Sequence, residues 1–232
     1  MPEYLSQDSM SKPTIIFATG FGMAQSAGSK ISSRHLNLMS FTRSRVYDIC
    51  WRLSGKRHQA CYRSMAELIE AEVSKGRNVN LVNYSFGGSV GSSGAKGYTE
   101  QNPSRLKEGY GCVIGICQVC AFSPPDNTAL IDMSGPREHG RLFYDRDSDG
   151  WEDRDVYVGI LKKQRSDTYE GPPVREGAYA RWMEVPTWYL LCIKDIAIPI
   201  DLQEYMVGEA REMGADLTTR RLDADQQATR DT

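Results

Sequence analysis

Short apolar segments alternate with helical ones along most of this chain of 232 residues. A parallel pair of strands needs a long crossover connection, usually a helix, so this alternation is typical of a mostly parallel sheet flanked by helices. The sequence therefore predicts an α/β protein. Strands are expected at 14–18, 79–83, 112–121, 187–193 and 217–222, and helices at 64–75, 85–96 and 201–213. The first and last of these helices are each expected to begin at a capping pair, Ser64 with Glu67 and Asp201 with Glu204.

Two stretches do not follow the alternation. Residues 34–63 are basic and show no clear periodicity, so we expect helix and loop there. Residues 125–182 are rich in charge, Pro, Gly and aromatics, and they lie between two predicted strands. We interpret them as an inserted lid on a core formed by 12–124 and 183–232. The aromatic residues of the lid would form its small core or line a substrate pocket.

Composition excludes several classes of protein. Lys and Arg total 28 against 30 Asp and Glu, which is not the basic excess of a nucleic-acid-binding protein. No apolar run approaches the ~18 residues of a membrane span. Residues 1–12 are polar and show no secretory signal, so we expect a cytoplasmic protein. Its six cysteines should then be mostly buried thiols.

One motif carries chemistry: Asn83–Tyr84–Ser85–Phe86–Gly87–Gly88, at the junction of a predicted strand and a helix of small residues. This is the context of a nucleophile elbow, a sharp turn that raises a Ser hydroxyl above the sheet. The amino end of the helix places backbone N–H groups where negative charge would develop. The alternative is an ordinary strand–loop–helix with a chance Ser.

Together with the loop at 19–22 and the segments 120–125 and 188–199, this motif resembles the α/β-hydrolase fold. It is most similar to the small-lid esterases that include plant methylester esterases, hydroxynitrile lyases and microbial relatives. The resemblance covers residues 12 to about 224. It implies that Ser85 is the nucleophile, that Asp195 orients the base, and that the N–H groups of Phe21 and Phe86 hold the oxyanion. Alternatively, Asp195 is a strand-end carboxylate that caps a nearby helix.

The sequence departs from this family at the base. The family's His should follow Asp195, but Gln226 stands at that position, and His35, His58 and His139 all precede the acid. Gln cannot accept the Ser proton at neutral pH. His139, within the predicted lid, could replace the base or be a surface residue. Asn83 also replaces the first Gly of the elbow, and Thr19 replaces a His before Gly20.

Two patterns are similar to metal sites. Asp145, Asp147 and Asp149 alternate as in a calcium loop, but Val156 stands where the closing Glu should be. Cys112, Cys117 and Cys120, with Cys192 as a distant fourth, have the spacing of an iron–sulfur loop. These cysteines lie within an apolar strand whose side chains alternate faces, so we expect buried thiols. Neither a metal nor another cofactor is expected.

These observations favour an enzyme that acts on a small ester, thioester or carbonyl compound through Ser85. Analogy with the family suggests a polyketide-type substrate of secondary metabolism. A second hypothesis is a degenerate hydrolase that binds a ligand or partner without turnover. A third is a lyase or cyclase that uses the oxyanion hole without acylating Ser85. The expected partner is a small molecule, neither nucleic acid nor membrane, and the sequence does not indicate the oligomeric state.

Overall fold

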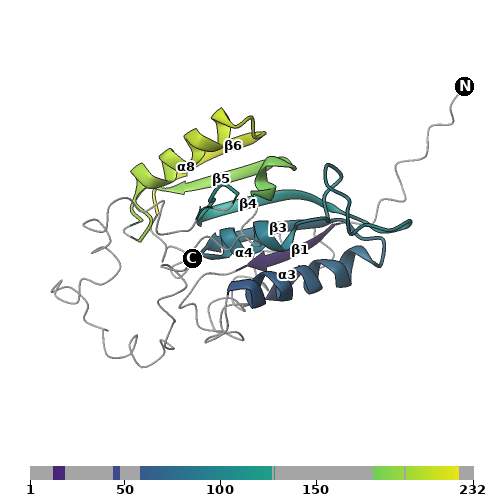
Figure 1. Cartoon of the computed structure of the whole chain (residues 1–232). Coiled ribbons are helices and arrows are strands. Elements are labelled where there is room, and N and C mark those ends of the chain that lie inside the picture. Colours follow the sequence, from purple (N-terminus) through teal and green to yellow (C-terminus); the bar gives the residue numbers. More distant parts are fainter. Residues whose placement is uncertain are drawn as a thin grey trace, which may run out of the picture.

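The computed structural model describes residues 13–18, 44–47, 58–126, 128, 180–195 and 197–224. Within these ranges one parallel sheet has the strand order β2-β1-β3-β4-β5-β6. Figure 1 labels β1 and the strands β3 to β6 of this sheet. The predicted α/β class with a mostly parallel sheet is therefore confirmed. The strands are β1 (Thr14–Ala18), β2 (Ser44–Tyr47), β3 (Val79–Ser85), β4 (Val113–Ala121), β5 (Thr187–Cys192) and β6 (Leu217–Leu222).

Strand β2 lies in the stretch for which helix and loop were expected, so that part of the prediction was wrong. Its four residues, Ser44 to Tyr47, are too few to give a periodic pattern. Among the described strands β2 lies at the edge of the sheet, and it pairs with β1 alone. An edge strand pairs with only one neighbouring strand. Whether four residues form such a strand depends on this pairing, which a local sequence pattern does not show.

The helices are α3 (His58–Val73), α4 (Gly87–Gly94) and α8 (Ile200–Glu212), with a short 3₁₀ helix, η4 (Arg181–Met183). Helix α3 begins before Ser64, so the predicted start at Ser64 was wrong and that residue lies inside the helix. One stripe of α3 side chains, spaced four apart, is buried in the core: Cys61, Met65, Ile69 and Val73. This apolar stripe continues past Ser64 and outweighs the local capping signal.

Helix α4 is built from small residues because it approaches both a strand and a helix closely. A Cβ added at Gly88 would lie 3.0 Å from the Ala121 Cβ and would overlap the Phe122 carbonyl oxygen. A Cβ added at Gly94 would collide with the side chain of Met65 on α3. The glycines therefore lower the helix propensity of α4 but allow its close packing, as the sequence predicted.

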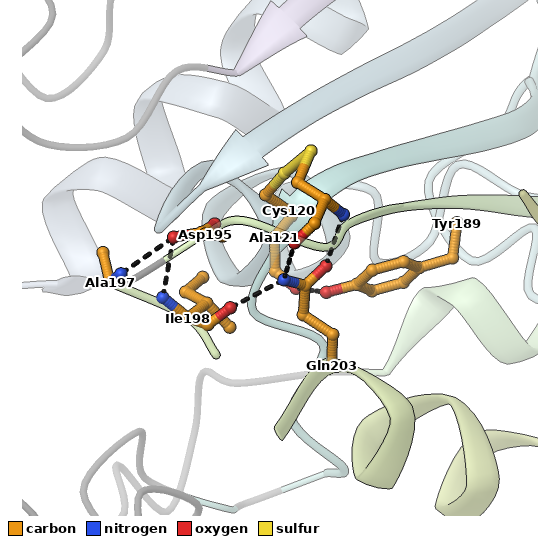
Figure 2. Close-up of a disulfide and its surroundings, with 8 residues drawn as sticks. Cys120, Ala121, Tyr189, Asp195, Ala197, Ile198 and Gln203 are labelled. Atoms are coloured by element: carbon orange, nitrogen blue, oxygen red, sulfur yellow. Dashed lines mark hydrogen bonds between the residues drawn. A yellow bond between two sulfur atoms is a disulfide. The ribbon is translucent and has the colours of Figure 1, made fainter. Parts of the chain in front are cut away.

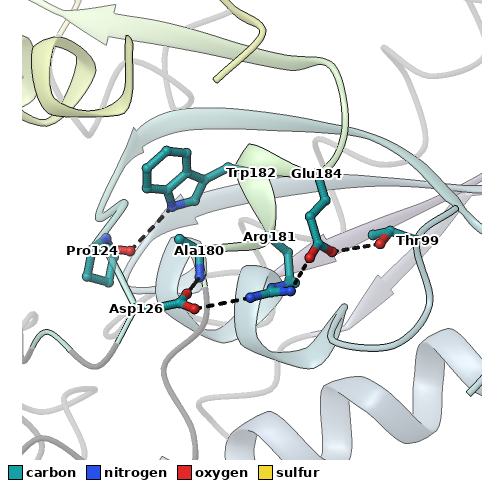
Figure 3. A network of polar contacts seen from close by, with 7 residues as sticks. All are labelled: Thr99, Pro124, Asp126, Ala180, Arg181, Trp182 and Glu184. Atoms are coloured by element: carbon teal, nitrogen blue, oxygen red, sulfur yellow. Dashed lines mark hydrogen bonds and ion pairs between the residues drawn. The ribbon is translucent and has the colours of Figure 1, made fainter. Parts of the chain in front are cut away.

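The two ends of the predicted lid meet beside η4 (Figure 3). Asp126 accepts a hydrogen bond from the Ala180 backbone N–H and pairs with the Arg181 guanidinium at 3.3 Å. Arg181 also pairs with Glu184, whose carboxylate accepts a hydrogen bond from the Thr99 hydroxyl at 2.6 Å. The chain thus leaves the core and returns to it at one place. The rest of the predicted lid (127 and 129–179), with the calcium-like pattern at 145–149, lies outside the described residues, and the lid stays a prediction.

No helix within the described ranges is long and apolar enough to cross a membrane.

Candidate active site

The strand order places Ser85 where the chain changes direction across the sheet. From β1 the chain goes to β2 on one side and then returns to β3 on the other side of β1. Connections that leave neighbouring strands in opposite directions open a crevice at the carboxyl ends of those strands, where open α/β sheets bind ligands. Ser85 is the last residue of β3 and therefore lies at this switch point of the sheet.

The turn at Ser85 is strained. Its φ is 55°, in the left-handed region that residues other than Gly seldom occupy. Helix α4 begins only two residues later, at Gly87, and Phe122 donates a backbone hydrogen bond of 3.0 Å to the Ser85 carbonyl. Ser85 itself is only partly buried. A sharp strand-to-helix turn with an accessible, strained Ser is the backbone geometry that a nucleophile elbow requires.

Asp195 lies just beyond the carboxyl end of β5, with 5% of its surface exposed. One of its carboxylate oxygens accepts backbone hydrogen bonds from Ala197 at 2.8 Å and Ile198 at 3.0 Å (Figure 2). Helix α8 begins later, with Pro199 at its N-cap and no side-chain cap. The alternative that Asp195 caps a helix is therefore wrong for α8, because this carboxylate closes the turn before it. The expected capping role of Asp201 is also wrong, since Asp201 lies within the first turn of α8.

A buried amide, Gln203 of α8, holds this turn in place. Its Nε2 donates hydrogen bonds to the carbonyl oxygens of Cys192, at 3.0 Å, and Ile198, at 2.6 Å. Its Oε1 accepts a hydrogen bond from the Cys192 N–H at 3.0 Å. One fully buried side chain therefore ties the end of β5 to the far side of the Asp195 turn. The sequence analysis did not identify Gln203, because its partners are backbone atoms.

We expect Gln203→Leu to lower the free energy of unfolding by about 3 kcal/mol, since it leaves buried backbone groups at Cys192 and Ile198 without hydrogen bonds. Urea unfolding measures this loss. The control is Glu212→Leu on the exposed end of the same helix, which should change stability by less than about 0.5 kcal/mol. Equal effects from the two substitutions would contradict the role of Gln203.

Tyr189 of β5 joins the Asp195 side of the site to the Ser85 side. Its hydroxyl donates a hydrogen bond of 2.6 Å to the Ala121 carbonyl at the end of β4. Burial, together with the nearby Asp195 charge, holds the pKa of this phenol well above its usual range, so it stays a neutral donor. Ala121 is in turn the β4 neighbour of Ser85 in the sheet. A short chain of contacts thus connects the two predicted catalytic residues.

Cys120 and Cys192 form a disulfide between the ends of β4 and β5 (Figure 2). The expectation of mostly buried thiols was therefore wrong for this pair, although Cys61, Cys112 and Cys117 are free. The pairing excludes Cys120 and Cys192 as ligands of the iron–sulfur pattern. The prediction assumed a regular strand, but the pairing of β3 with β4 is irregular at this point. Tyr84 pairs with Val119, whereas the next residue, Ser85, pairs with Ala121. Cys120 is the extra residue, and its φ is 40°.

The remaining predicted site residues, Phe21, His139 and Gln226, lie outside the described residues. β1 ends at Ala18, which pairs with Asn83, two residues before Ser85 in the neighbouring strand. In the part of the chain that the structure describes, no group of three or more His, Cys, Asp or Glu side chains could hold a metal ion.

The strand order, the connections and the strained Ser at the end of β3 define the class: the chain has the α/β-hydrolase fold. Solved structures agree. They include a pyrethroid hydrolase from Sphingobium faniae JZ-2, with a TM-score of 0.63, 16% identity, and coverage of 94% of this chain and 91% of that one. Polyneuridine aldehyde esterase matches with a TM-score of 0.63, 15% identity and 94% coverage of both chains. A methylesterase from Arabidopsis has a TM-score of 0.61 and 15% identity, and the match covers 94% of this chain and 92% of that one.

By sequence, the chain is 28% identical over 142 residues to the α/β hydrolase nvfD of Aspergillus novofumigatus (strain IBT 16806). That match covers 53% of this chain and 54% of the fungal protein, so it spans about half the length of this curated relative. No protein-family model matches the chain.

Proposed function

We propose that this protein is a serine-hydrolase-type enzyme that acts on a small ester, thioester or related carbonyl compound. The observation that carries the proposal is the left-handed backbone of Ser85 at the strand-to-helix turn, at the carboxyl end of β3, where the topology of the sheet switches between β1 and β3. Strain of this kind persists only where the surrounding structure fixes it, and it concentrates at active sites. Esterases and hydrolases among the structures that share the fold support the same reaction class.

The proposed reaction begins with attack of the Ser85 hydroxyl oxygen on the substrate carbonyl carbon while a base takes the hydroxyl proton. The N–H groups of Phe86 and Phe21 would hold the negative oxygen of the tetrahedral intermediate. Collapse of the intermediate breaks the bond to the alcohol or thiol, which leaves with the proton. Water then attacks the acyl group and frees Ser85. Asp195 would hold the base in position, as the acid of a triad does.

The residue that takes the Ser85 proton, the general base, is still to be assigned. Gln226 stands where the family has its His, so we propose that His139 of the predicted lid supplies the imidazole. A second candidate function, ligand or partner binding without turnover, is favoured by the same Gln226, since Gln cannot accept the proton. A lyase or cyclase that leaves Ser85 unacylated is the third. By analogy with the family, we propose a substrate of the polyketide type.

A fluorophosphonate probe, which bonds covalently to an activated Ser, tests the proposal. We expect one label per wild-type chain, at Ser85, located by peptide mass spectrometry. Ser85→Ala should abolish labelling because it removes the attacking oxygen, whereas Ser104→Ala, in an exposed loop, should label fully. A folded wild-type protein that takes no label would overturn the hydrolase proposal. If it also gained thermal stability from added ligands, the binding function would be favoured instead.

His139→Gln should slow this labelling about 10²–10⁴-fold, the usual contribution of a general base. His35→Gln and His58→Gln are matched controls for which no loss is expected. The labelling rates of the three variants are compared at one pH between 7 and 8. A loss confined to either control would assign the base to that residue and remove His139 from the mechanism.

A cytoplasmic location remains part of the proposal and must accommodate the disulfide. Cytoplasmic thiols reduce accessible disulfides by direct attack on sulfur. Cys120 is 0% exposed and Cys192 3% exposed, so the bond is shielded from such attack in the folded protein. Burial therefore allows the disulfide to persist once it has formed.

A further inference from the structure

Asn83 occupies the position that is Gly in the G-x-S-x-G elbow, two residues before Ser85. Its side chain is fully buried between β3 and α4. A Cβ added at Gly91 of α4 would overlap the Asn83 amide, with Oδ1, Cγ and Nδ2 as its nearest atoms. The close contact between strand and helix requires a small residue on one side. In this protein that residue is Gly91 on α4, and the Asn83 amide of β3 occupies the place where a Cβ at position 91 would lie.

Gln118 of β4 lies beside Asn83, because the two residues are paired in the parallel sheet and so point to the same face. Gln118 is also fully buried. The oxygen and nitrogen atoms of both amides have no hydrogen-bond partner among the described residues. Leaving one such group unsatisfied shifts the folding equilibrium about 5- to 150-fold toward the unfolded chain, so four are not tolerated without compensation.

Ser92 supplies a third polar group. It lies one helical turn after Gly88, which contacts the end of β4, so it occupies the face of α4 toward that strand. Its hydroxyl is buried and likewise has no partner in the described part of the chain. Donors and acceptors from β3, β4 and α4 are therefore buried together between the sheet and α4, near the turn at Ser85.

We propose that the side-chain amides of Asn83 and Gln118 are bridged beneath the turn by one buried water molecule that Ser92 also contacts, and that Asn83 thereby positions Ser85. The two amides are complementary, since each offers a donor and an acceptor. Asn83 touches both arms of the turn, the strand that ends at Ser85 and the helix that follows it. An error of about 1 Å in a reacting group lowers rates about 100-fold, so this support matters for reaction at Ser85.

The positioning role rests on the proposed function of Ser85, whereas the packing beneath it is tested by stability alone. The first experiment is a double-mutant cycle of Asn83→Gly and Gly91→Ala, read by urea unfolding. Gly91→Ala alone should shift the unfolding equilibrium at least about 30-fold, because its Cβ collides with the Asn83 amide. In the Asn83→Gly background the same change should cost less than about fivefold, since the space is then empty. Additive effects would overturn the packing proposal.

A second cycle tests the amide pair. Gln118→Leu alone leaves the Asn83 amide unpartnered. The double variant, Asn83→Leu with Gln118→Leu, removes both amides while Gly91 is kept. The double variant should therefore be more stable than the sum of the single losses predicts, by at least about fivefold in the unfolding equilibrium. A crystal structure should place both amides within hydrogen-bond distance of one shared water molecule. Additive losses, or amides that share no water molecule, would overturn the bridge.

Positioning is tested by the saturation kinetics of fluorophosphonate labelling. Asn83→Gly should lower the maximal labelling rate at least about tenfold and leave the half-saturating concentration unchanged, because the pocket stays intact while Ser85 is misplaced. Asn83→Ser, which keeps a short polar group, should recover part of the rate. A folded Asn83→Gly that labels at the wild-type rate would overturn the positioning role. If wild type takes no label but both stability cycles show coupling, the proposed function fails and the packing proposal stands.

Discussion

In a His139→Gln background, which lacks the proposed base, Gln226→His is expected to hydrolyse p-nitrophenyl acetate about 10²–10⁴ times faster than His139→Gln alone. The reason is chemical: Ser85 needs a neighbouring group that accepts a proton at neutral pH, and an imidazole does so while an amide does not. Asp195 follows β5 and its turn is fixed by two backbone N–H groups, so the acid that would orient the new imidazole is held in place. The initial rate of nitrophenolate release at pH 7 to 8 measures the gain.

The neighbouring residue provides a matched control. Gln227→His adds the same imidazole one residue further along the chain, and it should give less than a tenth of the gain, since the catalytic base must lie within hydrogen-bond reach of the hydroxyl. Adding Ser85→Ala to Gln226→His should abolish the new activity. If Gln226→His stays inert although folded and labelled, position 226 is not that of the base. If Gln227→His gains more, the register of the chain after β6 is displaced by one residue.

Much of the fold could be predicted because its signals are local. β1 and β6 have the predicted bounds, and β3, β4 and β5 differ from prediction by at most two residues at either end. The apolar runs of the inner strands β1, β3, β4 and β5 are dictated by burial on both faces of a parallel sheet. β2 was missed because its pairing with β1 is the only thing that makes it a strand. The start of α3 was misplaced because one local capping pattern was given more weight than the continuous apolar stripe.

The candidate site divides in the same way. The placement of Ser85 and Asp195 at one edge of the sheet could be predicted, since each lies at the end of a recognisable strand and parallel strands bring their carboxyl ends to one edge. Their catalytic roles stay a prediction. Gln203 and Tyr189 could not, because each binds backbone atoms of segments distant in sequence. Such bonds depend on tertiary structure and leave no pattern of spacing. The polar character of Asn83 and Gln118 within apolar strands was the one visible signal that the sequence analysis did not develop.

Removal of the disulfide through Cys120→Ala combined with Cys192→Ala should lower the free energy of unfolding by about 4 kcal/mol. The bond joins residues 72 apart in sequence, and closing a loop of that length in the unfolded chain accounts for about this much. The expected fall in Tm is roughly 8 to 16 °C for a domain of this size. Urea and thermal unfolding measure both quantities, and Cys117→Ala is the control that removes a sulfur from the same strand without breaking a crosslink.

Thiol chemistry checks the same bond independently. Burial raises the pKa of the free Cys117 thiol to about 11, so iodoacetamide at pH 8 should alkylate it slowly in the folded protein. After denaturation and alkylation, a reductant should expose two further thiols, at Cys120 and Cys192. The disulfide joins the end of β4, beside the Ser85 turn, to the end of β5, which leads to Asp195. If a reductant lowers the urea concentration at the midpoint of unfolding, the crosslink stabilises the site. If the midpoint is unchanged, and Cys120 and Cys192 are both alkylated before reduction, the protein carries no such bond.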